Sequence, residues 1–102
     1  MTGWKIVYSQ SSREQARGLN PAIRPIVKRR IEEIRENPFL GKPLERELAG
    51  YHSYRARRFR IIYKIDVSSR VVQVHYIGHR KDVYELFKGA LQEKPPQPSV
   101  PM

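Results

Sequence analysis

The chain has 102 residues, no cysteine, and 20 Lys plus Arg against 10 Asp plus Glu, a formal net charge of +10. A chain of this length supports one hydrophobic core and therefore one domain. The lack of cysteine excludes a disulfide-stabilised scaffold, a thiolate metal site and a thiol nucleophile. The apolar runs are too short to cross a membrane and no signal peptide is visible, so we expect a soluble cytoplasmic domain.

The N-terminal part of the chain predicts a strand and two helices. WKIVYS at 4–9 alternates and is rich in β-forming residues. Ser11 and Glu14 have the spacing of a capping box and predict a short helix. A proline follows Asn20, which predicts the start of a second helix that ends at Asn37. The apolar stripe of this helix consists of Ile23, Val27, Ile31 and Ile34.

Strands dominate the part of the chain that follows the turn-rich linker at 37–43. Three consecutive segments have strand composition: 51–58, 59–66 and 71–77. Gly78 is expected to end the last of them. A C-terminal helix then follows, with the apolar stripe Val83, Phe87, Ala90 and Leu91.

These elements predict an α+β fold: an N-terminal strand, a two-helix hairpin, an antiparallel three-stranded meander and a C-terminal helix. We assign this domain to residues 1–92. The remaining ten residues, 93–102, contain four prolines and are expected to be extended or disordered.

The positive charge is concentrated in the predicted meander. Between Tyr51 and Lys81 there are eight basic residues and only one acidic residue, Asp66, whereas the first fifty residues hold ten basic and six acidic ones. Such a patch implies a polyanionic partner: nucleic acid, a ribosome, an anionic membrane or an acidic protein.

The side chains of this basic segment favour metal-free chemistry on a phosphodiester. The only imidazoles are His52, His75 and His79, and the last two run from a strand into a loop rather than along one helix, so we predict no metal and no cofactor. No phosphate-binding loop, nucleophile elbow or carboxylate pair is present. Guanidinium groups stabilise the anionic pentacoordinate transition state of phosphodiester cleavage, and RNA supplies its own 2′-hydroxyl nucleophile.

Each candidate also has a simpler explanation. Arg60 alone is compatible with a solvated strand arginine, Tyr84 with a core residue, and Asp82 with a helix cap. The remaining arginines of the segment, Arg55, Arg57 and Arg58, can act by electrostatic steering alone.

Two segments, YRARRFRIIYKID at 54–66 and VVQVHYIGHRKDVYELF at 71–87, resemble the RelE/ParE superfamily of type II toxin–antitoxin toxins. The resemblance covers roughly residues 3–88. RelE-like members are ribosome-dependent mRNA interferases that cut codons in the A site, whereas ParE-like members poison DNA gyrase and lack the catalytic set. The basic and polar residues of this chain favour the RelE branch.

The resemblance implies a role for each matching residue. Arg60 matches the arginine that stabilises the phosphate, Arg80 an arginine near the leaving group, His79 a general acid or base, and Tyr84 a tyrosine that orients the mRNA. Arginines replace the usual lysines on the basic strand, and because a guanidinium stays protonated, the proton transfer shifts towards His79. The predicted RNA-binding residues are Arg55, Arg57, Arg58, Lys64 and Lys81, with the register of the three arginines open by one or two positions.

We therefore predict a metal-independent endoribonuclease that cleaves mRNA by 2′-hydroxyl attack, leaving a 2′,3′-cyclic phosphate. Its expected partners are the ribosome with its mRNA and an acidic antitoxin, which covers the basic sheet face, displaces the C-terminal helix and forms a hetero-oligomer able to bind operator DNA. The alternatives are a ParE-like gyrase inhibitor without catalysis and a non-toxic basic nucleic-acid-binding module.

Overall fold

The computed structural model describes residues 3–92, and the predicted tail at 93–102 lies outside this range. In chain order the elements are β1 (Lys5–Tyr8), α1 (Gln10–Arg17), α2 (Arg24–Glu36), η1 (Pro38–Leu40), β2 (Lys42–Pro43), η2 (Arg46–Leu48), β3 (Tyr51–Ala56), β4 (Phe59–Asp66), β5 (Val71–His79) and α3 (Val83–Gln92). The η elements are short 3₁₀ helices. The predicted α+β fold is confirmed.

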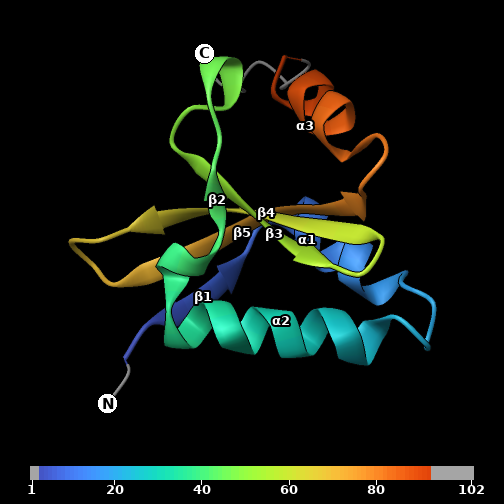
Figure 1. Ribbon diagram of the computed structural model, residues 1–102, viewed down its shortest axis with the longest axis horizontal. Helices are drawn as coiled ribbons and strands as arrows, with labels where there is room; N and C mark the ends of the chain where they lie inside the picture. Colours follow the sequence, from blue (N-terminus) through green and yellow to red (C-terminus); the bar gives the residue numbers. More distant parts are fainter. Residues whose placement is uncertain (1–2, 93–102) are drawn as a thin grey trace, which may run out of the picture.

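The strands form one five-stranded sheet in the order β1-β5-β4-β3-β2. The predicted meander of β3, β4 and β5 is antiparallel throughout, and β1 pairs with β5 in parallel. Helices α1 and α2 lie against one face of the sheet, while α3 stands over the other (Figure 1). The sheet therefore separates two apolar cores.

The larger core lies between the sheet and the helical hairpin. The predicted stripe of α2 supplies Val27, Ile31 and Ile34, all of them buried. Because alternate strand residues face the same side of a sheet, Ile61 and Tyr63 of β4 meet this stripe. The smaller core lies under α3 and contains four buried residues: Leu48, Ile62, Val83 and Phe87.

Side chains of helix α1 form hydrogen bonds with backbone groups of β5, near and beyond the end of its pairing with β1. Ser9 caps the helix by accepting a hydrogen bond from the Ser12 amide, so the predicted capping box at Ser11 and Glu14 is wrong. Ser12 is buried and donates to the Val74 carbonyl at 2.8 Å. Gln15 accepts from the Ile77 amide at 2.8 Å. These polar side chains take the place of a neighbouring strand along this part of β5.

Several predicted boundaries need correction. Strand β3 ends at Ala56, which leaves Arg57 and Arg58 as a two-residue turn. Strand β5 continues through Gly78 to His79, because Gly78 pairs with Arg60 of β4. The glycine serves close packing: a Cβ at this position would lie 3.1 Å from the Val83 Cγ2 of α3.

Further corrections concern the helices and the linker. Asn20 caps a turn by accepting from the Ala22 amide, and α2 begins only at Arg24. Two linker residues form the edge strand β2. In α3, Val83 and Phe87 are buried as predicted, but Ala90 and Leu91 are exposed. The helix rises away from the sheet towards its C-terminal end (Figure 1). Within residues 3–92, no helix is both long enough and apolar enough to cross a membrane.

Candidate functional site

The β3–β4 hairpin and the end of β5 bring arginines to one end of the sheet. Arg55 and Arg60 are direct partners in the β3–β4 ladder. The Arg80 amide donates to the Arg58 carbonyl at 2.7 Å, so the segment after β5 lies against the hairpin turn. This resolves the open register: Arg55 and Arg60 share the face that α3 covers, and Arg57 and Arg58 form the turn.

Arg57 occupies a position that favours glycine. Its φ is +60°, and two-residue hairpin turns need a positive φ at their first residue. Arg46 and Arg70 also have positive φ, so the feature is shared by three arginines. The sequence predicts this turn poorly because no glycine or asparagine marks it.

Arg60, Ser53 and Tyr84 form a hydrogen-bonded chain across three elements. The Arg60 Nη1 atom of β4 donates to the Ser53 Oγ of β3 at 3.3 Å, and this oxygen lies 3.0 Å from the Tyr84 hydroxyl of α3. Ser53 is only 1% exposed, whereas Arg60 and Tyr84 are half-buried and reach the surface. The structure thus brings two of the four predicted catalytic residues together.

The site arginines have no carboxylate partner among residues 3–92. The ion pairs of this part of the chain join Arg30 to Glu33, Arg35 to Glu32 and Lys88 to Glu85, each within one helix. The guanidinium groups at the hairpin end therefore keep their charge available for an external anion.

His79 is not joined to this chain. Its ring packs edge-on against Phe59, with the centroids 5.6 Å apart, and Phe59 belongs to the core on the α1/α2 side. His79 Nδ1 accepts from the Lys81 amide at 3.3 Å. His79 and Arg60 therefore lie on opposite faces of the same sheet end, and the proton-transfer role of His79 stays a prediction.

The two predicted lysines lie apart from each other. Lys81 is exposed in the turn before α3, close to Arg80. Lys64 lies four residues along β4 from Arg60, and its Nζ sits 5.3 Å from the centre of the Tyr51 ring. Lys64 therefore extends the positive charge along the α3 face and away from the hairpin.

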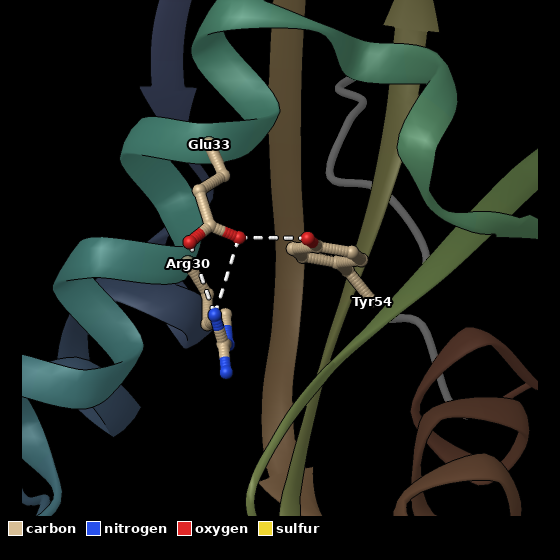
Figure 2. A network of polar contacts seen from close by, with 3 residues as sticks. All are labelled: Arg30, Glu33 and Tyr54. Carbon is tan, nitrogen blue, oxygen red and sulfur yellow. Dashed lines mark hydrogen bonds and ion pairs between the residues drawn. The ribbon is translucent and has the colours of Figure 1, made fainter.

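A polar network anchors β3 on the opposite face. The Tyr54 hydroxyl donates to Glu33 at 2.7 Å, and Arg30 donates to the same carboxylate (Figure 2). The hydrogen bond from Tyr54 lowers the pKa of Glu33 and raises the pKa of Tyr54. Because Tyr54 precedes Arg55, this network fixes the base of the arginine-bearing hairpin to α2.

The other two histidines are packed into the sheet. His52 stacks on Tyr63, and its Nδ1 atom is buried without a hydrogen-bond partner in the described part of the chain. His75 contacts Tyr51 and Phe87 beneath α3. Burial lowers the pKa of both imidazoles. Among residues 3–92, no three His, Asp or Glu side chains lie close enough together to hold a metal ion.

Ser53 is the site residue that sequence reasoning missed. Its only signal is position: it alternates with Tyr51 and Arg55 on one face of β3, where a small hydroxyl residue replaces the branched or aromatic residue expected at a buried strand position. Its partners, Arg60 and Tyr84, become visible only in the folded chain.

Comparison with known proteins identifies the family. A model described as the ParE toxin of type II toxin–antitoxin system, parDE, matches residues 6–84. The chain belongs to this toxin family, within the RelE/ParE superfamily. The toxin is 31% identical to Toxin RelG of Mycobacterium tuberculosis over 83 residues, which cover 79% of this chain and 95% of RelG.

Solved structures agree with this assignment. The toxin–antitoxin complex RelBE2 of Mycobacterium tuberculosis contains a chain 30% identical to this one, with a TM-score of 0.69 and coverage of 76% of this chain and 98% of that chain. A mutant of the E. coli toxin RelE in the free state matches 92% of this chain and all of its own with a TM-score of 0.72. At 18% identity, this second match shows the fold alone.

Proposed function

We propose that this toxin is an mRNA endonuclease that acts in the A site of the ribosome. The observation that carries the proposal is the group of arginines at the hairpin end, which have no carboxylate partner in residues 3–92 and lie at the same end of the sheet as the chain Arg60–Ser53–Tyr84. Similarity to toxins named RelG and RelE also supports it.

In the proposed reaction the 2′-oxygen of one nucleotide attacks the adjacent phosphorus, and the bond from phosphorus to the 5′-oxygen breaks. The products are a 2′,3′-cyclic phosphate and a 5′-hydroxyl end. Arg60 contacts the non-bridging oxygens, whose negative charge grows in the transition state. The 2′-hydroxyl proton must leave and the 5′-oxygen must gain one, and we assign this exchange to His79, with Arg80 beside the leaving oxygen. Because His79 packs against Phe59 on the face opposite Arg60, this assignment requires the His79 ring to leave Phe59 and turn towards the bound RNA.

The same proposal gives roles to the rest of the surface. Tyr84 stacks on or hydrogen-bonds to the mRNA. The surrounding cations contact phosphates: Arg55, Arg57, Arg58, Lys64 and Lys81. The toxin acts in the cytoplasm, and an acidic antitoxin neutralises it by covering the basic face and displacing α3, in a hetero-oligomer that also binds operator DNA.

The test is to express the chain in bacteria and to map transcript 5′ ends during translation. We expect growth arrest and cleavage in phase with codons. Arg60→Ala should lower the cleavage rate by about 100-fold, the usual effect of losing one transition-state donor. Arg80→Ala and His79→Gln test the remaining roles, and Arg13→Ala on α1 is the matched control.

Gyrase inhibition is the second candidate, because the matching family model is described as a ParE toxin and His79 is separate from Arg60. DNA damage with intact transcripts after induction would favour it over the nuclease. A chain that causes no growth arrest would instead be a plain nucleic-acid-binding module.

A further inference from the structure

We infer that Ser53 is a positioning residue that holds Arg60 and Tyr84 in one arrangement for the RNA. This inference rests on the proposed nuclease function and concerns a buried serine on β3. Ser53 is the only residue to which both surface groups hydrogen-bond within the described chain.

Backbone geometry places the Ser53 hydroxyl at the centre of the site. Ser53 pairs with Ile62 in the β3–β4 ladder, and Arg60 lies two residues from Ile62, so the two side chains share the α3 face as diagonal neighbours. Tyr84 reaches the same oxygen from above, on the first turn of α3. One hydroxyl therefore joins two strands of the sheet and the helix.

A serine suits this task better than a carboxylate. A guanidinium has five N–H donors, so the bond to Ser53 uses one and leaves the others for a phosphate. The hydroxyl is neutral, and it orients Arg60 without cancelling the charge that attracts the RNA. A carboxylate at position 53 would compete with the phosphate for the same guanidinium.

The surroundings strengthen the arrangement. Ile62 and Val83, two neighbours on the α3 face, are fully buried, and Gly78 lets Val83 pack closely against the sheet beside Arg60. Hydrogen bonds in such an apolar environment are stronger than in water. Arg60 and Tyr84 are thus held before the RNA arrives, which lowers the entropic cost of reaching the transition state.

The experiment compares Ser53→Ala, Tyr84→Phe and the double variant in single-turnover cleavage of mRNA on purified ribosomes. We expect Ser53→Ala to reduce the cleavage rate constant by about 10-fold, as for loss of a hydrogen bond to a charged group, with ribosome affinity unchanged. Because the two changes break one shared arrangement, the double variant should cleave at a rate close to that of the slower single variant. Ser11→Ala, an exposed serine on α1, is the matched control, and Ser53→Thr should restore part of the rate.

A second readout does not depend on cleavage. In NMR spectra, rotation of the Arg60 guanidinium should be slow in the wild-type chain and fast in Ser53→Ala, while the thermal unfolding midpoints remain close. The inference would be overturned if Ser53→Ala cleaved at the wild-type rate. It would also be overturned if the fold-reduction in the double variant equalled the product of the reductions in the two single variants. If the wild-type chain cleaves nothing, the nuclease proposal fails, and unchanged Arg60 rotation in Ser53→Ala would then refute the positioning of Arg60 as well.

Discussion

At the residue scale, Tyr63 shows how one buried hydroxyl organises the linker before the sheet. Its ring lies in the larger core, and its hydroxyl donates to the Pro38 carbonyl at 2.7 Å and accepts from the Gly41 amide at 3.0 Å. Gly41 must be a glycine, because any Cβ there would collide with the Tyr63 hydroxyl and ring. The residues NPFLG therefore form a fixed connection from α2 to β2.

Tyr63→Phe should destabilise the fold by about 1–3 kcal/mol at pH 7, because two buried backbone groups lose their partner. It should also change the response to base. Burial raises the pKa of Tyr63 to about 12, above the value of 10.0 for an unfolded tyrosine. The stability linked to this group is present below pH 10 and is lost as the pH rises towards 12. Urea unfolding at pH 7 to 12 should show a smaller alkaline decline in Tyr63→Phe; equal declines would contradict the assignment.

Arg57 is predicted to lower stability while adding charge to the turn. A non-glycine residue in the left-handed region costs about 1 kcal/mol, so Arg57→Gly should be stabilising or neutral despite the entropy of glycine in the unfolded chain. Arg46→Gly relieves the same backbone conformation in η2 and removes the same charge. The two variants should show similar changes in thermal unfolding midpoint, but only Arg57→Gly should weaken RNA binding. Equal binding by the two variants would show that the turn arginine has no role there.

Predictability at this scale depends on whether a residue's partner is local. Alternation along β4 places Arg60 and Ile62 on one face, and the structure confirms it. The roles of Ser53 and Tyr63 could not be predicted, because their hydrogen-bond partners are distant in sequence. Tyr63 bonds to Gly41 and Pro38, and Ser53 bonds to Tyr84, over separations of 22 to 31 residues. Ser9, in contrast, caps α1 through a hydrogen bond to a residue only three positions away. It is missed because Ser11 and Glu14 also have the three-residue spacing of a capping box.

At the element scale, α3 is attached to the sheet by few groups. Among residues 83–91, Val83 and Phe87 are buried, and Tyr84 adds the hydrogen bond to Ser53. His75 lies against the buried Phe87 of this helix, with its ring centroid 6.2 Å from that of Phe87 and 5.2 Å from that of Tyr51. A charge on His75 would therefore arise within the docking surface of the helix.

We predict that α3 loosens in mild acid. Burial, with help from the nearby Lys64 ammonium, lowers the pKa of His75 below 6.5, so the folded chain favours the neutral ring. The stability linked to His75 is complete above pH 6.5 and is lost as the pH falls through the folded-state pKa. Hydrogen exchange of α3 amides, corrected for intrinsic rates, should show less protection near pH 5 than near pH 7.5, on either side of the ordinary histidine pKa of about 6.5. His75→Phe keeps the aromatic packing and should abolish the difference; if it persists, another group such as His52 causes it.

Element types are predictable because their periodicities are strong. The stripe of α2 and the alternation of β4 each specify one element: β4 has its expected bounds, and α2 lies within its expected range but begins only at Arg24. The ends of elements are not predictable in this way, because they depend on tertiary pairing. Strand β5 continues through Gly78 because β4 supplies a partner, and β2 exists only because β3 lies beside it. The exposed end of α3 likewise depends on the tertiary arrangement, because the helix rises away from the sheet there (Figure 1).

At the scale of the whole molecule, the net charge is +10, and the basic side chains differ in whether they pair with a carboxylate. On α2, Arg30 and Arg35 pair with carboxylates of the same helix. At the hairpin end, the arginines have no such partner in residues 3–92. The charge count could be predicted from the sequence, but which arginines pair with a carboxylate became clear only from the fold.

This asymmetry predicts how binding depends on salt. Each phosphate that the toxin neutralises releases counterions, so the slope of log affinity against log salt becomes less negative by about 1 for each basic side chain removed from the backbone of the RNA. Arg55→Ala/Arg58→Ala should therefore make the slope less negative by about 2, whereas Arg13→Ala/Arg17→Ala on α1 should leave it nearly unchanged. Both pairs lower the net charge by the same amount, so any difference between them reports location rather than total charge.

The measurement is titration of ribosomes carrying an mRNA with 2′-deoxynucleotides in the A-site codon, which removes the nucleophile and isolates binding from cleavage. Equal slopes for the two double variants would mean that only the total charge matters, and that it attracts the RNA without direct contacts from the hairpin. A less negative slope for the hairpin pair alone would mean that the hairpin itself contacts the RNA backbone. The strained turn, the hairpin arginines and the Arg60–Ser53–Tyr84 chain would then form one continuous surface for RNA.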